Sequence, residues 1–107
     1  SEIRELIHPL VHDNSNQSLA EARVKPGCET QLHRHPVAEE LYHITQGEGL
    51  MQLDQETFLV KAGDTVIIKP GIPHKIKSTG NTELKILCCC SPAYSHEDTT
   101  ILEPAQA

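Results

Sequence analysis

The sequence predicts an all-β domain, because short apolar runs alternate with turn signals along most of its 107 residues. The runs are rich in Val, Ile, Leu and Thr, and apolar residues alternate with polar ones, as on strands that bury one face. Glycine, proline, asparagine and aspartate separate the runs. Residues 2–6 are the one segment with some helical period. Many short strands in one domain favour a sandwich or a barrel.

The expected strands follow, in chain order, from alternation and from the turns that bound them. Residues 18–24 alternate before a Lys-Pro-Gly turn, and residues 40–45 alternate before a glycine-containing turn. Residues 65–68 (TVII) are a β-branched run that follows an Ala-Gly-Asp turn. The complete set of expected strands is 18–24, 29–35, 40–45, 50–53, 57–60, 65–68, 74–78 and 83–90.

Length and charge exclude several classes of protein. The length predicts one domain that spans residues 1–107. Nine basic and fifteen acidic residues give a formal charge of −6, which argues against binding to the phosphates of nucleic acid. No apolar run approaches the about 20 residues of a membrane-spanning helix. The charged N-terminus lacks the apolar segment of a secretory signal, so we expect a cytoplasmic protein.

Four cysteines are present, and three of them are consecutive at Cys88, Cys89 and Cys90. On a strand, Cys88 and Cys90 face one way and Cys89 faces the other. We interpret them as small apolar residues of a strand in a reducing cytoplasm rather than as a disulfide framework. A redox role for these thiols is the alternative.

Two histidines and one glutamate are placed to share an inward face. His33 and His35 alternate along an expected strand, so their imidazoles project together. Glu40 alternates with Tyr42, which places it inward, whereas Glu39 is expected to face outward. Imidazole and carboxylate groups are suitable ligands for divalent transition metals.

His74 completes the candidate set, because it follows a Pro-Gly-Ile-Pro turn and begins a new strand. Three imidazoles and one carboxylate predict a site for one divalent ion, with Mn, Fe, Ni, Cu, Co and Zn all open. The alternative is a polar barrel mouth without metal. The His-Glu-Asp stretch at residues 96–98 is interpreted as a solvated acidic segment.

These residues stand in a spacing that resembles the two sequence motifs of the cupin superfamily, over about residues 20–91. The first motif is matched at Gly27, His33, His35, Glu40 and Gly47. The second motif is matched at Gly63, Gly71 and His74. It departs at Lys69, where the family often has proline, and at Ser78, where its pattern ends in asparagine. Neither departure affects a proposed ligand.

The resemblance implies a double-stranded β-helix, or jelly-roll barrel, whose interior holds the metal. It also implies a homodimer, which would cover the apolar residues that both ends of the chain carry. These residues are Ile3, Leu6, Ile7, Leu10, Val11, Ile101 and Leu102.

The function that the resemblance implies is metal-dependent oxidation of a small molecule, as in a dioxygenase. Sugar or sugar-phosphate isomerisation is a second hypothesis, although alternation turns Arg34 and Lys75 away from the interior. A non-enzymatic small-molecule or metal-binding sensor is the third. Gln31, Tyr42 and Gln52 are the residues expected to line the substrate cavity.

Overall fold

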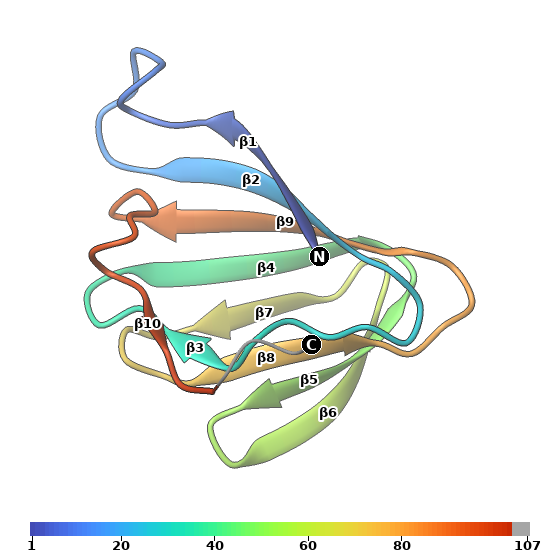
Figure 1. The fold of residues 1–107 in the computed structure, drawn as a ribbon. Coiled ribbons are helices and arrows are strands. Elements are labelled where there is room, and N and C mark those ends of the chain that lie inside the picture. The colour runs from blue at the N-terminus through green and yellow to red at the C-terminus, as the bar shows by residue number, and fades with distance from the viewer. Residues whose placement is uncertain (104–107) are drawn as a thin grey trace.

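The computed structural model describes residues 1–103 (Figure 1). All the regular secondary structure in that range consists of β-strands. None of the described segments is therefore a helix able to cross a membrane. The strands, in chain order, are β1 (Glu2–Ile7), β2 (Ser18–Val24), β3 (His33–Arg34), β4 (Glu39–Gln46), β5 (Glu48–Leu53), β6 (Glu56–Lys61), β7 (Thr65–Ile68), β8 (His74–Ser78), β9 (Leu84–Ser91) and β10 (Thr100–Ile101).

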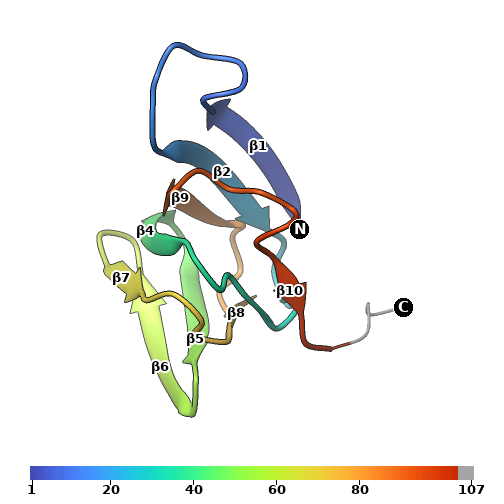
Figure 2. The ribbon, with the colours of Figure 1, turned by 90° about the vertical axis from the view of Figure 1, so that its left-hand side faces the viewer.

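The strands form two antiparallel sheets that pack face to face (Figures 1 and 2). The first sheet has the order β1-β2-β9-β4-β7, and the second has the order β10-β3-β8-β5-β6. Neighbours within each sheet are mostly distant in sequence, as expected when the chain crosses repeatedly between the two layers. This arrangement confirms the predicted all-β jelly roll.

Alternation along each strand separates a buried face from an exposed one. On β4, Tyr42 and Ile44 are buried, whereas Leu41 and Thr45 are exposed. Full burial of an aliphatic side chain such as Ile44 contributes about 1.5–3 kcal/mol. The core between the two sheets consists of Ala22, Val24, Tyr42, Ile44, Met51, Val60, Val66, Ile68, Ile76, Leu84 and Ile86.

The N-terminal segment differs from its sequence pattern. The helical period at residues 2–6 is overridden, because β1 pairs antiparallel with β2 at the edge of the first sheet. Pairing with β2 satisfies the backbone groups on one side of β1, and those on the open edge are left to solvent.

The expected strand at residues 29–35 is also wrong in extent. Only β3 is regular there, and Glu29 makes an isolated bridge to Lys77. The segment still follows β8, since the amide of Thr30 donates to the carbonyl of Ile76 over 3.0 Å. His33 therefore stays paired with β8 of the second sheet, and His35 follows directly after β3.

Candidate metal centre

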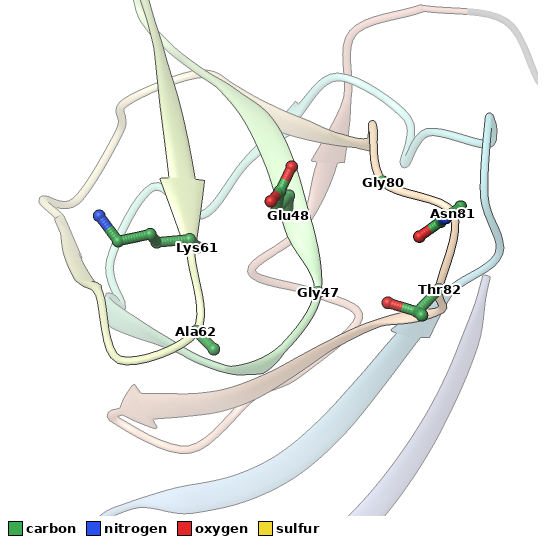
Figure 3. A pocket seen from close by; sticks show the side chains of 7 residues that line it. All are labelled: Gly47, Glu48, Lys61, Ala62, Gly80, Asn81 and Thr82. Carbon is green, nitrogen blue, oxygen red and sulfur yellow. The ribbon is translucent and has the colours of Figure 1, made fainter.

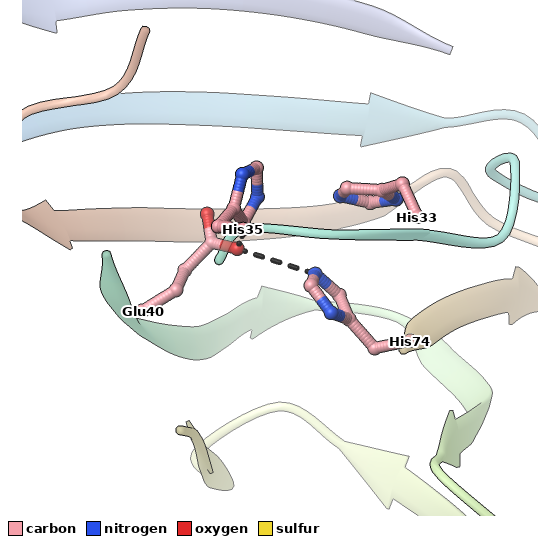
Figure 4. Close-up of side chains that lie close together, drawn as sticks. All are labelled: His33, His35, Glu40 and His74. Atoms are coloured by element: carbon pink, nitrogen blue, oxygen red, sulfur yellow. Dashed lines mark ion pairs between the residues drawn. The ribbon is translucent and has the colours of Figure 1, made fainter. Parts of the chain in front are cut away.

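Four side chains converge at one end of the barrel (Figure 4). His33 comes from β3, His35 follows it directly, Glu40 lies near the start of β4, and His74 begins β8. Each offers one ligand atom, and these atoms lie within 4.8 Å of one another. The sequence prediction that these four residues come together is confirmed; their role as metal ligands stays a prediction.

Sheet register and one loop contact bring the histidines together. His33 on β3 pairs directly with His74 on β8, and their ring centroids are 4.2 Å apart. The amide of Gly71 donates to the carbonyl of His35 over 2.8 Å. That hydrogen bond attaches the turn before His74 to the backbone of another candidate ligand, so the second motif is held against the first.

Glu40 is the acidic centre of the set. Its Oε1 lies 3.3 Å from Nε2 of His35 and 3.3 Å from Nε2 of His74, and the residue is only 5% exposed. Burial alone would raise the pKa of Glu40, but contacts with the two imidazoles outweigh burial and lower this pKa to about 2. The carboxylate is therefore ionised at neutral pH.

The pKa values of His33 and His35 are shifted in opposite directions. Burial, followed by the neighbouring charge of His74, lowers the pKa of His33 to about 4, so His33 is neutral at pH 7. Burial also disfavours the charged form of His35, but its contacts with Glu40 outweigh this effect and raise its pKa. A neutral imidazole is the form that binds a metal.

The proton positions on two of the rings follow from local hydrogen bonds. Nδ1 of His33 lies 2.8 Å from the carbonyl oxygen of Gln31, and Nδ1 of His74 lies 2.9 Å from that of Ile72. A carbonyl only accepts, so each Nδ1 carries the proton. Nε2 of each ring then presents a lone pair to the centre of the cluster.

The donor set fits a divalent cation. Among residues 1–103, Glu40 Oε1 and His74 Nε2 are buried and have no hydrogen-bond partner, although they face each other across 3.3 Å. An unpartnered polar atom in the interior costs free energy, more so when it is ionised. Three imidazole lone pairs and one carboxylate would hold a transition metal, which satisfies these atoms at once.

Cys90 makes a contact that the sequence did not reveal. Its side chain is buried, and its thiol donates to Oε2 of Glu40 over 3.2 Å. Burial, followed by the charge of Glu40, raises the pKa of Cys90, so the thiol keeps its proton. Strand parity placed Cys88 and Cys90 on one face, but only the pairing of β9 with β4 places Cys90 opposite Glu40.

The expected lining residues fall into different places. Tyr42 is buried, with its ring centroid 5.7 Å from that of His74, and burial raises its pKa so that it remains a phenol. Gln31 is half-buried beside His33, and its backbone carbonyl accepts a hydrogen bond from Nδ1 of that ring. The expectation that Gln52 lines the cavity is corrected. Gln52 pairs with Lys75 on the face opposite the buried Met51, away from the interior.

The outward residues lie as alternation predicts. Glu39 is exposed, in contrast to Glu40, and Arg34 is exposed as well. Lys75 forms ion pairs with Glu29 and Glu103, both over 3.5 Å.

A separate hollow lies at the far ends of β4 and β8 (Figure 3). It has a volume of about 300 Å³ and is open to solvent. The residues that line it are Gly47, Glu48, Lys61, Ala62, Gly80, Asn81 and Thr82. The length of both strands separates this hollow from the histidines.

Comparisons with known proteins agree with the fold. The protein MJ1618 of Methanocaldococcus jannaschii, described as uncharacterized, is 58% identical over 94% of this chain and 81% of its own length. An oxalate-binding protein of Thermotoga maritima is 33% identical over 80% of this chain and 71% of its own length.

Among solved structures, a predicted oxalate decarboxylase of Thermotoga maritima superposes with a TM-score of 0.77 and 30% identity. It covers 84% of this chain and 78% of that one. A family model described as "Cupin domain" matches residues 20–90, which include all four candidate ligands. The chain therefore belongs to the cupin family.

Proposed function

We propose that the protein binds one divalent transition metal through His33, His35, Glu40 and His74, and that a small carboxylate ligand coordinates this metal. The observation that carries the proposal is the pair of buried atoms, Glu40 Oε1 and His74 Nε2, for which residues 1–103 offer no hydrogen-bond partner. A metal with six ligands would have two positions left for the small molecule.

Charge supports an anionic ligand. Three neutral imidazoles and one carboxylate leave a divalent ion with a net charge of about +1. The two remaining positions of a six-coordinate metal would suit a bidentate anion such as oxalate, the ligand named for the 33%-identical relative. Iron or manganese in this position would supply oxidation chemistry, which makes a dioxygenase or another oxidoreductase the preferred enzymatic function.

The chain's own residues would hold and orient the site. The carbonyls of Gln31 and Ile72 fix the proton on Nδ1 of His33 and His74, and Cys90 holds the second oxygen of Glu40. The isomerase hypothesis has less support, because Lys75 is engaged by two glutamates outside the barrel. A phosphosugar would need an inward cation.

The test is elemental analysis of the full chain purified without chelators, followed by calorimetric titration with oxalate. We expect about one transition metal per chain, and oxalate binding to the metal-loaded protein only. The variant His74→Ala should lose both. Absence of metal, or equal oxalate binding by metal-free protein, would contradict the proposal. Oxygen consumption or decarboxylation with oxalate would assign an enzyme, and binding without turnover would assign a sensor.

The proposed assembly is a homodimer formed through the first sheet. Directly paired residues place an apolar row across the outer face of all five strands, and none of its members is charged. We name it the outer row; it consists of Ile7, Leu19, Cys89, Leu41 and Ile67. Ile67 is 60% exposed and Leu41 is 38% exposed, so the row is available to a second copy of this chain.

A cytoplasmic location is also part of the proposal. All four cysteines are free, and Cys28 is exposed. An exposed free thiol persists in a reducing compartment, which is the condition of the cytoplasm.

A further inference from the structure

The third imidazole of the cluster is held differently from the other two. Nδ1 of His35 lies 3.2 Å from the carbonyl oxygen of Asp98 and 3.2 Å from Oγ1 of Thr99, more than sixty positions along the chain. The hydroxyl of Thr99 donates to the carbonyl of Ser95 over 2.9 Å, so its oxygen accepts from His35. Two acceptors at Nδ1 fix the proton there and leave Nε2 free to bind a metal.

The side chain of Asp98 has a second role. Its Oδ1 accepts from the amide of Val37 and its Oδ2 from the amide of Ala38, each over 2.8 Å. These amides belong to the loop that connects His35 with Glu40. Hydrogen bonds to an ionised carboxylate are stronger than neutral ones, so Asp98 fixes the separation of two proposed ligands. The interpretation of residues 96–98 as a purely solvated stretch is therefore wrong for Asp98.

The segment that carries Asp98 is attached at both ends. We name residues 94–103 the C-terminal strap; it leaves the end of β9 and runs to β10, beside β3 (Figure 1). At its start, the amide of Tyr94 donates to Oγ of Ser18 over 2.9 Å. At its end, β10 pairs with β3, and Oε1 of Glu103 accepts from the amide of Leu32 over 2.8 Å. Asp98 lies between these attachments.

We propose that the C-terminal strap orients the ligands of the metal centre and that Asp98 is the residue that positions His35 and the 36–38 loop. The strap lies beyond residues 20–90, the part of the chain that matches the family model, so this support comes from residues outside the matched domain. The inference rests on the proposed metal site. Asp98 itself touches neither metal nor substrate; it acts through the ring of His35 and through the 36–38 loop.

The experiment measures metal affinity and geometry in the full chain. Co²⁺ is titrated into metal-free protein in competition with a chromophoric chelator, and the visible absorption of the bound Co²⁺ reports the coordination. Asp98→Asn removes the charge and one acceptor oxygen. We expect an affinity lower by about 10–100-fold, the usual effect of losing an outer partner of a ligand, and an altered spectrum.

Glu97→Gln is the matched control, since it removes the same charge from the adjacent, exposed residue. We expect its affinity and spectrum to equal those of the unaltered chain. A long-range charge effect would weaken both variants equally and would overturn the inference. Thr99→Val removes the hydroxyl that accepts from His35 and donates to the carbonyl of Ser95, and we expect it to shift the spectrum in the same direction as Asp98→Asn.

The outcomes separate the two proposals. If the unaltered chain binds no Co²⁺, the proposed metal site fails and this inference fails with it. If the unaltered chain binds Co²⁺, and Asp98→Asn binds it with the same affinity and spectrum, only the role of the strap is overturned. Circular dichroism in chelator checks that each variant is folded. Should Asp98→Asn be unfolded, Thr99→Val decides, and an unchanged spectrum in that variant overturns the inference.

Discussion

At the scale of single residues, the site depends on which of two adjacent glutamates faces inward. Glu39 is exposed, whereas Glu40 is buried among imidazoles and accepts from the thiol of Cys90. The two side chains are chemically identical, and only their positions on β4 distinguish them. A metal site built on Glu40 is therefore testable with a pair of variants that differ by one position.

We expect Glu40→Gln to weaken binding of a divalent metal by at least about 100-fold. The variant keeps the shape of the side chain but removes its charge, and one pair of unit charges 4 Å apart is worth about 4 kcal/mol at a partly buried position. Glu39→Gln should bind metal as the unaltered chain does. Competition with a chelator measures both affinities. Equal losses in the two variants would contradict the assignment of Glu40.

At the scale of elements, the turn between β4 and β5 shows why a motif position is glycine. Gly47 has φ of +86°, and a Cβ built there would lie 2.9 Å from the carbonyl oxygen of Glu83. Gly63 has φ of +97°, but a Cβ there would have no atom within 4 Å. Both positions have a positive φ, which favours glycine, and at Gly47 a side chain would in addition contact the neighbouring backbone.

Gly63→Ala should therefore lower the free energy of unfolding by about 1–2 kcal/mol, which is the cost of a left-handed backbone for a residue with a Cβ. Gly47→Ala should lose clearly more, because the added methyl group contacts backbone that has to shift. Urea denaturation of the metal-free variants measures both free energies. The steric argument fails if Gly47→Ala is no less stable than Gly63→Ala.

At the scale of the whole molecule, the two sheets have different outer faces. The outer row crosses the first sheet without a charged member. The outer face of the second sheet includes Gln52, Lys75 and Lys77, with Leu59 as an exposed apolar residue. The outer face of the first sheet also carries Glu21, Arg23 and Lys85 beside the outer row. A contact between two copies along the outer row itself would bury apolar surface.

We expect Ile67→Glu to weaken dimerisation by at least about 100-fold, because an unpaired charge in an interface costs about 3 kcal/mol or more. Leu59→Glu is the control, since Leu59 is even more exposed but lies on the other sheet. Sedimentation over a range of concentrations measures the molecular mass of each variant. A monomeric unaltered chain, or a monomer for Leu59→Glu as well, would refute the proposed interface.

The sequence by itself determined the all-β class, the identity of the four converging side chains and the inward choice of Glu40 over Glu39. The four side chains were identified from the spacing of the two cupin-like motifs, and sheet register brings them together. Alternation along a strand is a property of the backbone, and it suffices for the inward choice of Glu40. The same rule, applied to the buried Met51, would have placed Gln52 outward.

Only the tertiary structure decided what surrounds the ligands. The strand pairing of residues 2–7, the contact of Cys90 with Glu40 and the hold of Asp98 on His35 all join segments distant in sequence. Such contacts have no local period, since sheet register and the course of the C-terminal strap fix which residues meet. The sequence therefore specified which four side chains are the proposed metal ligands, and the fold specified the hydrogen bonds that orient them.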